Sequence, residues 1–129
     1  MRGGQVLLAR RHGDKHFQIP GGKIEPSEND IDALTREVEE ELAIALVPDS
    51  AVRLAAFEAQ AVRQRDVLVE VRLYNGAVDG IREVSSEITE LVSQSPAAPT
   101  VPCSDVVRLH ILPFLAHCLS EQGSIPCQP

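Results

Sequence analysis

Three glutamates, Glu37, Glu40 and Glu41, are spaced so that a helix would carry all of them on one face. At about 100° per residue, positions separated by three and four residues lie close together on a helix. Like charges placed in this way repel each other by a few tenths of a kcal/mol per pair. Mg²⁺ takes oxygen ligands and commonly uses carboxylates together with substrate phosphates. The spacing therefore predicts a divalent-cation site, and the competing interpretation is a solvated acidic face.

The residues around the glutamates favour the metal site over the solvated face. Pro20-Gly21-Gly22 lies just upstream, and glycine lets the backbone approach a ligand closely because it carries no side chain. Arg36 adjoins the cluster, and its forked guanidinium can orient a carboxylate. The acidic helix is therefore interpreted as part of a binding site.

Helix and strand signals place this segment in an α/β domain. Asn29 or Asp30 can cap a helix that runs to about Leu42. The buried stripe of that helix is expected to consist of Ile31, Leu34, Val38 and Leu42. Strands are expected at residues 5–11, 17–20, 52–62 and 66–74. Because strands and helices interleave, we expect a mixed sheet.

The C-terminal quarter of the chain is expected to be a loop followed by a helix. Ser93 to Cys103 is rich in serine and proline, which is typical of a loop. Ser104 is expected to cap a helical region reaching about Glu121, with Pro113 either kinking it or starting its second piece. We expect one domain over residues 1–122 and a disordered tail at residues 123–129.

Composition narrows the class of protein. The 129 residues carry a formal net charge of −7, and the acidic excess lies after residue 23, which disfavours nucleic acid as a partner. No apolar run approaches the ~18 residues of a membrane span, and the start does not resemble a secretory signal. The cysteines Cys103, Cys118 and Cys127 lack metal-site or disulfide-framework spacing. A cytoplasmic protein without a membrane partner is expected.

The segment from Gly22 to Ile44 resembles the Nudix box. That motif is Gly, five residues, Glu, seven residues, then Arg-Glu-hydrophobic-any-Glu-Glu-any-Gly-hydrophobic. Eight of its nine specified positions are filled here: Gly22, Glu28, Arg36, Glu37, Val38, Glu40, Glu41 and Ile44. A chance match of this quality is on the order of one in a million for this length. Ala43 stands at the ninth position, where the box has glycine.

The resemblance extends to the flanking segments and implies a fold. Residues 5–22 and 87–92 are similar to the segments that flank the box in MutT-like members of the family. The implied fold is a Nudix-like α/β/α sandwich with a mixed sheet. Relatives usually have one more strand before the strand at residues 5–11, and only Met1 to Gly4 precede it here. The sheet is therefore expected to lack the usual first strand, unless the chain begins earlier or a second chain supplies it. A bare edge strand invites pairing, which favours a homodimer.

The resemblance also implies roles for individual residues. The implied catalytic set is Glu37, Glu40 and Glu41 as metal ligands, with Arg36 and Glu28 holding the loop and the helix in place. The carbonyl of Gly21 and a downstream carboxylate, Glu87 or otherwise Glu90, would complete the metal ligands. The candidate phosphate contacts are Arg10, Arg11 and Lys23. Base stacking would have to rely on Phe17, Phe57 or Tyr74, and the competing interpretation of each is a core residue.

The implied activity is hydrolysis of a diphosphate bond. The expected protein is a MutT-like Nudix pyrophosphohydrolase that needs Mg²⁺ or Mn²⁺ and acts on a nucleoside triphosphate or a nucleoside diphosphate derivative. RNA cap removal is disfavoured by the net charge. The alternative is a catalytically inert Nudix-like module that binds a nucleotide or a partner. Intact Glu37, Glu40 and Glu41 favour the enzyme, whereas Ala43 and the short N-terminus leave room for the inert module.

Overall fold

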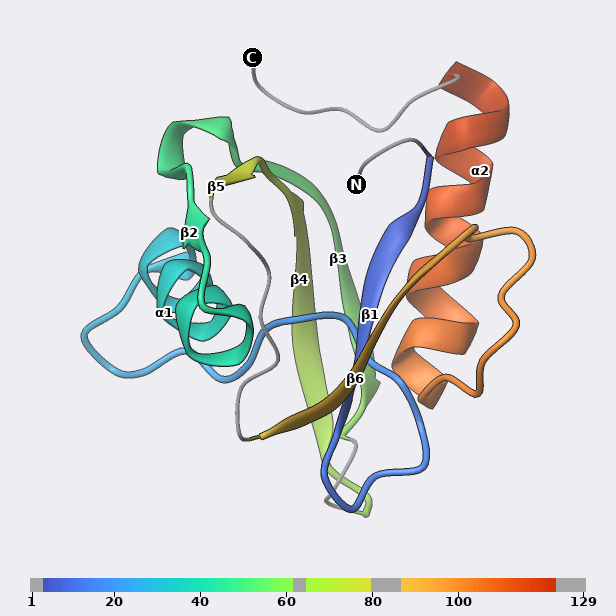
Figure 1. Ribbon diagram of the computed structural model, residues 1–129, viewed down its shortest axis with the longest axis horizontal. Coiled ribbons are helices and arrows are strands. Elements are labelled where there is room, and N and C mark those ends of the chain that lie inside the picture. The colour runs from blue at the N-terminus through green and yellow to red at the C-terminus, as the bar shows by residue number, and fades with distance from the viewer. Residues whose placement is uncertain (1–3, 62–64, 80–86, 123–129) are drawn as a thin grey trace.

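The computed structural model describes residues 4–61, 65–79 and 87–122, and its strands pair in antiparallel ladders beside two helical regions (Figure 1). The ladders are β1 (Val6–Arg11) with β6 (Ile88–Gln94), β3 (Val52–Gln60) with β4 (Leu68–Asn75), and β2 (Ala45–Leu46) with β5 (Val78–Asp79). The helical segments are α1 (Asp30–Leu42), η1 (Pro48–Ser50), η2 (Val107–Ile111) and α2 (Leu112–Gln122). The predicted α/β class is confirmed. The expected tail lies outside the described residues.

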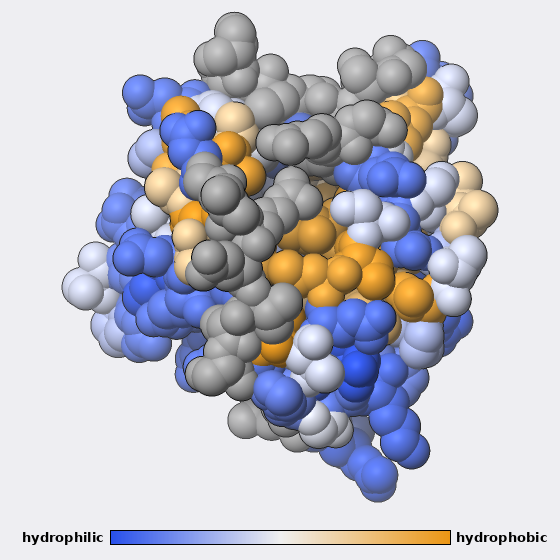
Figure 2. Space-filling model, viewed as in Figure 1, coloured by the Kyte–Doolittle hydropathy of each residue, from blue (hydrophilic) through white to orange (hydrophobic). Residues whose placement is uncertain are grey.

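The sheet differs in detail from the expected continuous mixed sheet. Within the described residues the three ladders stay separate, and the parallel pairing is limited to a bridge between Phe17 and Cys103. No strand precedes β1 in the described part of the chain, so no ladder joins β1 to β4. Residues of β1, α1 and β4 instead line a cavity of about 390 Å³. Apolar side chains show in this region of the surface in Figure 2.

Helix α1 starts where the sequence predicts, because Asn29 forms a capping box. The Asn29 side chain accepts a hydrogen bond from the Asp32 backbone at 2.8 Å, and the Asp32 carboxylate accepts one from the Asn29 backbone at 3.4 Å. Val38 and Leu42 are buried as predicted, and Leu34 packs against them. Ile31 is only half-buried, so the buried stripe is narrower at the start of the helix than predicted.

The helix ends at Ala43, in a left-handed backbone conformation. Its φ is 55° and its ψ is 33°, and its N–H donates to the carbonyl of Glu39 at 2.9 Å. This is the conformation in which glycine commonly ends a helix, since a Cβ atom is strained there. The alanine at the glycine position of the box therefore keeps the glycine-type helix end instead of shifting it.

The last helical region is continuous, with a π-helical segment before Pro113. In η2 the N–H of Leu112 donates to the carbonyl of Val107, five residues back. Pro113 closely follows this π-helical segment, so its missing N–H falls where the regular hydrogen-bond ladder of the helix is already interrupted. Ser104 does not cap with its side chain, because its hydroxyl is buried without a hydrogen-bond partner among the described residues.

Two apolar clusters form the core. The larger cluster joins β1 and β4 to the C-terminal helices and includes Leu8, Leu73 and Ile111. The smaller one fixes α1 to the chain that follows it, through Val38, Leu42 and Ile44. Burial of these side chains stabilises each by roughly 1.5–3 kcal/mol relative to exposure. The acidic face of α1 is thereby held in a fixed orientation beside β1.

Candidate active site

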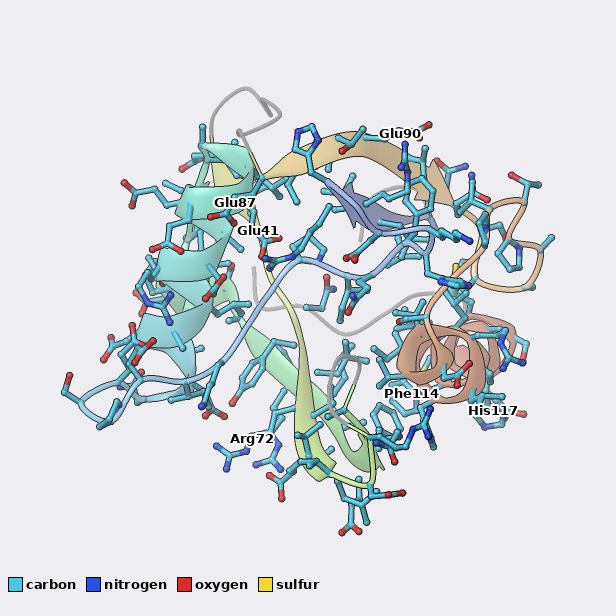
Figure 3. The ribbon with its side chains drawn as sticks, turned by 90° about the horizontal axis from the view of Figure 1, so that it is seen from below. Glu41, Arg72, Glu87, Glu90, Phe114 and His117 are labelled. Atoms are coloured by element: carbon cyan, nitrogen blue, oxygen red, sulfur yellow. The ribbon has the colours of Figure 1, made fainter. Side chains whose placement is uncertain are left out.

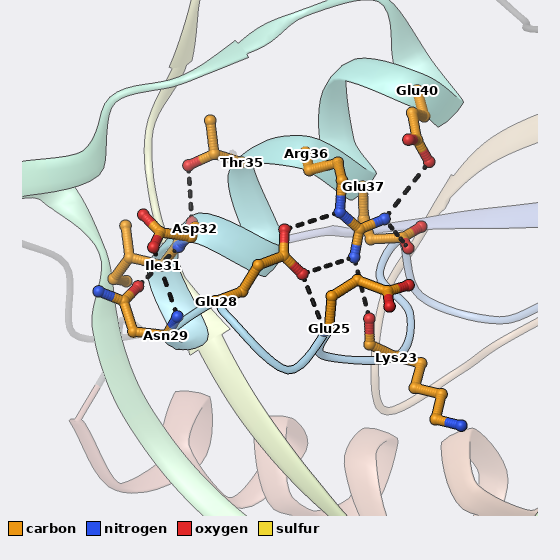
Figure 4. A network of polar contacts seen from close by, with 10 residues as sticks. All are labelled: Lys23, Glu25, Glu28, Asn29, Ile31, Asp32, Thr35, Arg36, Glu37 and Glu40. Atoms are coloured by element: carbon orange, nitrogen blue, oxygen red, sulfur yellow. Dashed lines mark hydrogen bonds and ion pairs between the residues drawn. The ribbon is translucent and has the colours of Figure 1, made fainter.

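Arg36 ties the glycine-rich loop to helix α1. Its Nε donates to Glu28 Oε2 at 2.7 Å and its NH2 group to Glu28 Oε1 at 2.9 Å, a forked pair (Figure 4). The same NH2 group donates to the Lys23 carbonyl at 3.0 Å. Glu28 Oε1 also accepts from the Glu25 backbone at 2.9 Å. The hydrogen bonds from Arg36 and then from the Glu25 backbone lower the pKa of Glu28 to about 2. These contacts link Glu28, Arg36 and the backbone of the glycine-rich loop to one another.

Glu37 lies between Arg36 and the glycine loop. Arg36 NH1 donates to Glu37 Oε1 at 2.7 Å. A Cβ atom at Gly22 would lie 2.6 Å from the Glu37 carboxylate, so a side chain at residue 22 would force that carboxylate to move. Gly21 has a φ of 145°, which also favours glycine. The two glycines therefore allow the loop backbone to pass directly over the carboxylate of Glu37.

Glu41 is a deeply buried carboxylate. Its exposed fraction is 2%, and Arg11 NH2 donates to its Oε1 at 2.7 Å. Burial raises the pKa of Glu41 to about 7, an effect that Arg11 opposes and the neighbouring charge of Glu37 reinforces. A buried carboxylate beside a second carboxylate is costly without a cation nearby. This arrangement is typical of functional sites.

The downstream acids Glu87 and Glu90 contact different arginines. Arg11 NH1 lies 3.6 Å from Glu87 Oε2, so one guanidinium contacts both Glu41 and Glu87. Figure 3 shows Glu87 beside Glu41 at the end of α1 and Glu90 further along β6. Arg10 NH2 donates to Glu90 Oε1 at 3.2 Å. Glu87 is therefore the downstream acid that lies next to the acidic face of α1.

The remaining predicted residues differ in exposure. The Glu40 side chain is 54% exposed, with one oxygen 3.6 Å from Arg36 NH1. Lys23 is exposed and its backbone carbonyl binds Arg36. Phe17 is 3% exposed in the larger core cluster, beneath the Arg10 guanidinium at 5.8 Å from the ring centroid. Phe17 is packed in the core, which favours its interpretation as a core residue over base stacking.

The sequence did not indicate how the start of α1 is fixed to β4. The Asp30 carboxylate accepts hydrogen bonds from the Tyr74 hydroxyl at 2.6 Å and from Arg72 NH1 at 2.5 Å. The hydrogen bond from Tyr74 and the bonds and charge of Arg72 lower the pKa of Asp30, against its desolvation. These partners are more than forty residues away along the chain, so no local pattern could have revealed them.

The donor atoms suit a hard divalent cation. Within the described residues, no three acidic, histidine or cysteine side chains already surround one point as a finished metal site. Arginines bind the carboxylates instead: Arg36 binds Glu37, and Arg11 binds Glu41. The available donors are carboxylate and carbonyl oxygens, the ligand type of Mg²⁺ and Mn²⁺. The space left by the missing Cβ of Gly22 opens onto the carboxylate oxygens of Glu37, and these oxygen donors fit such an ion.

Comparisons with known proteins bear on the family and the fold. The model of the NUDIX domain matches residues 1–99. A MutT NUDIX hydrolase from Burkholderia pseudomallei is 25% identical, with a TM-score of 0.73 over 89% of this chain and 88% of that chain. The E. coli ORF135 protein is 22% identical, with a TM-score of 0.75 over 96% and 88%. The Bacillus subtilis pyrophosphohydrolase BsRppH is 23% identical, with a TM-score of 0.69 over 96% and 78%.

Two negative findings concern curated relatives and membrane-spanning helices. A search of curated proteins found no match. In the described part of the chain, no helix is both long and apolar enough to cross a membrane. The matched domain model spans most of the chain and includes the whole Arg36 network, Glu41 and Glu87. With the domain model and the shared fold in agreement, this chain belongs to the Nudix hydrolase family.

Proposed function

We propose that the protein is a Mg²⁺- or Mn²⁺-dependent pyrophosphohydrolase that cleaves the diphosphate bond of a nucleoside triphosphate or a nucleoside diphosphate derivative. The observation that carries this proposal is the buried carboxylate of Glu41, which lies next to Glu37 below the glycine loop. A solvated acidic face would leave its glutamates exposed, as Glu39 and Glu40 are. Burying one acid beside another is unfavourable, and a cation bound between them would offset that cost.

In this proposal water attacks one phosphorus, and the bond from that phosphorus to the bridging oxygen breaks. When bound, the cation withdraws charge from the phosphoryl oxygens and lowers the pKa of the attacking water. Glu37, Glu40, Glu41 and Glu87 would hold the ion, together with the Gly21 carbonyl. Arg36 holds the Glu37 carboxylate and the loop backbone at Lys23 in fixed positions relative to each other. Phosphoryl transfer depends on such positioning.

The proposed phosphate contacts are Arg11 and Lys23, with Arg10 in an outer position. Arg11 lies beside Glu41 and Glu87, where the phosphates of a metal-bound diphosphate would be. Lys23 is exposed on the glycine loop. Arg10 already contacts Glu90, the Asp14 carbonyl and the ring of Phe17. We therefore rank Arg10 last among the three.

A screen for turnover tests the function. The full chain is incubated with nucleoside triphosphates and nucleoside diphosphate derivatives in the presence of Mg²⁺ or Mn²⁺, and release of phosphate or pyrophosphate is measured. Activity should disappear with excess EDTA and return when the divalent cation is restored. Turnover that persists in EDTA would refute the metal mechanism. A folded, metal-loaded protein that turns over none of these substrates would favour the inert binding module.

Two variants of helix α1 test the assigned residues. Glu41→Gln should lower kcat at least ~100-fold, the scale expected when charge stabilisation in the transition state is lost. Glu39→Gln is the matched control, because Glu39 is exposed on the same helix, away from Glu41. The control should keep kcat within about twofold, as expected for a change outside the site. Equal activity of both variants at saturating metal would place the chemistry elsewhere.

We also infer a cytoplasmic protein that acts on a small molecule and self-associates. Cys103 and Cys118 are buried free thiols, which suits a reducing compartment. The net charge of −7 disfavours contact with nucleic acid. Within the described residues each strand has a ladder partner on one edge only, and such open edges favour a homodimer. Sedimentation analysis over a range of protein concentrations tests the dimer, and a single monomeric species throughout would refute it.

A further inference from the structure

Arg11 makes the closest ionic contact to the buried carboxylate of the site. Its NH2 group donates to Glu41 Oε1 at 2.7 Å, and its NH1 group lies 3.6 Å from Glu87 Oε2. Glu41 is 2% exposed, whereas the Arg11 side chain is 36% exposed and the Glu87 side chain 59%. The guanidinium therefore lies between a buried acid and an exposed one, on a side chain that is itself partly exposed.

Charge balance explains why the guanidinium binds there. A buried carboxylate without a countercharge is strongly unfavourable, and Glu37 adds a second negative charge to the same region. Arg11 is the ion-pair partner of Glu41 in the described structure. It binds the same carboxylate that a divalent cation in this site would use. Two cations that share one carboxylate repel each other at such short separations.

The backbone at Arg11 permits a second position of the side chain. Arg11 is the last residue of β1, and the register of β1 against β6 shifts between Arg10 and Arg11. Such irregularities at strand ends redirect side chains and interrupt the ladder. An arginine at a strand end, one-third exposed, can move its guanidinium into solvent without disturbing the core.

We propose that Arg11 is the resident counter-cation of the metal-free site, and that a divalent cation binds Glu41 only by displacing the Arg11 guanidinium. This inference rests on the proposed metal-dependent function. Arg11 is then a positioning residue that sets the metal affinity of the site. Arg11 holds the carboxylates of Glu41 and Glu87 close together when no ion is bound. When the ion binds, the guanidinium leaves these two carboxylates but stays beside the site.

Metal binding without substrate tests the exchange. Free Mn²⁺ is measured by electron paramagnetic resonance during titration of the wild-type protein and of Arg11→Gln. The Arg11→Gln variant should bind Mn²⁺ roughly tenfold more tightly or better, a size usual for coupling between competing ligands. Arg10→Gln is the matched control, since Arg10 pairs with exposed Glu90, and its Mn²⁺ affinity should stay within about twofold. General damage to the site would weaken binding, so a gain in affinity is specific to the exchange.

Two further measurements cover an Arg11→Gln variant that fails to fold. Arg11→Lys keeps the charge without the forked geometry, and it should bind Mn²⁺ a few-fold more tightly than the wild type. In the wild-type protein, titration with Mg²⁺ should shift the guanidinium nitrogen resonance of Arg11 and leave that of Arg10 in place.

The outcomes separate this inference from the proposed function. Equal or weaker Mn²⁺ binding by Arg11→Gln would overturn the exchange while leaving the metal site intact. An unchanged Arg11 resonance at saturating Mg²⁺ would overturn it equally. Failure of Mn²⁺ to bind to either protein would overturn the exchange and the metal-dependent function together.

Discussion

Replacing Ala43 with glycine should stabilise the protein, although most substitutions destabilise. Ala43 is exposed and has a φ of 55° and a ψ of 33° at the end of α1. A residue with a Cβ atom costs roughly 1–2 kcal/mol in this conformation, and glycine does not bear that cost. Glycine also gives the unfolded chain more freedom, which offsets about 0.4–1 kcal/mol. The expected net gain in the free energy of unfolding is about 0.5–1 kcal/mol.

Denaturation of Ala43→Gly by urea and by heat measures this gain. The matched control is Ala56→Gly, because Ala56 is also exposed but lies in the regular strand β3. There, glycine should lower the free energy of unfolding by roughly 0.5–1 kcal/mol. The same chemical change should therefore have opposite signs at the two sites. Destabilisation of both variants to the same extent would refute the assignment of strain to the end of α1.

Two predictions concern the acids of the site. Because the folded protein raises the pKa of Glu41 from 4.5 to about 7, the folded state binds a proton more tightly than the unfolded state. Without metal, the raised pKa of Glu41 contributes at most about 3 kcal/mol to the free energy of unfolding. This contribution is complete below about pH 4.5 and is lost as the pH rises through about 7. Urea unfolding across this pH range measures it, and Glu41→Gln should flatten the profile; a wild-type profile equal to that of Glu41→Gln would contradict it. Separately, Glu87→Gln should lower metal-dependent turnover at least ~10-fold. Glu90→Gln, whose carboxylate pairs with Arg10, should have little effect, and the reverse order in steady-state kinetics would make Glu90 the ligand.

Local patterns predicted the parts of the fold that depend on neighbours in sequence. The Asn29 cap and the burial of Val38 and Leu42 follow from hydrogen bonds and packing within one helix. The box specifies both Arg36 and Glu28, but it did not predict that these two side chains form a forked pair. Each of these features is encoded within about fifteen residues.

Long-range contacts decided the features that the sequence could not predict. The sequence left Phe17 open to base stacking or to the core, and the bridge to Cys103 joins it to the C-terminal segment in the core. Ser104 looked like a helix cap, but its hydroxyl is turned into the interior. The sheet divides into separate ladders because pairing depends on which strands are adjacent in space. None of these outcomes has a local signature.

The strand pairing brings the basic and acidic parts of the chain together. The first 23 residues are basic and the remainder is acidic, which in sequence looks like a property of solubility alone. Pairing of β1 with β6 brings Arg10 and Arg11 from the basic segment into the acidic one. The register shift between them then gives the two arginines different partners: Arg10 contacts Glu90, and Arg11 contacts Glu41 and Glu87. One irregularity at the end of a strand thus separates a surface ion pair from the contact that neutralises the buried acid. For this reason Arg10→Gln and Arg11→Gln, although adjacent and chemically identical, should differ in their effect on metal binding.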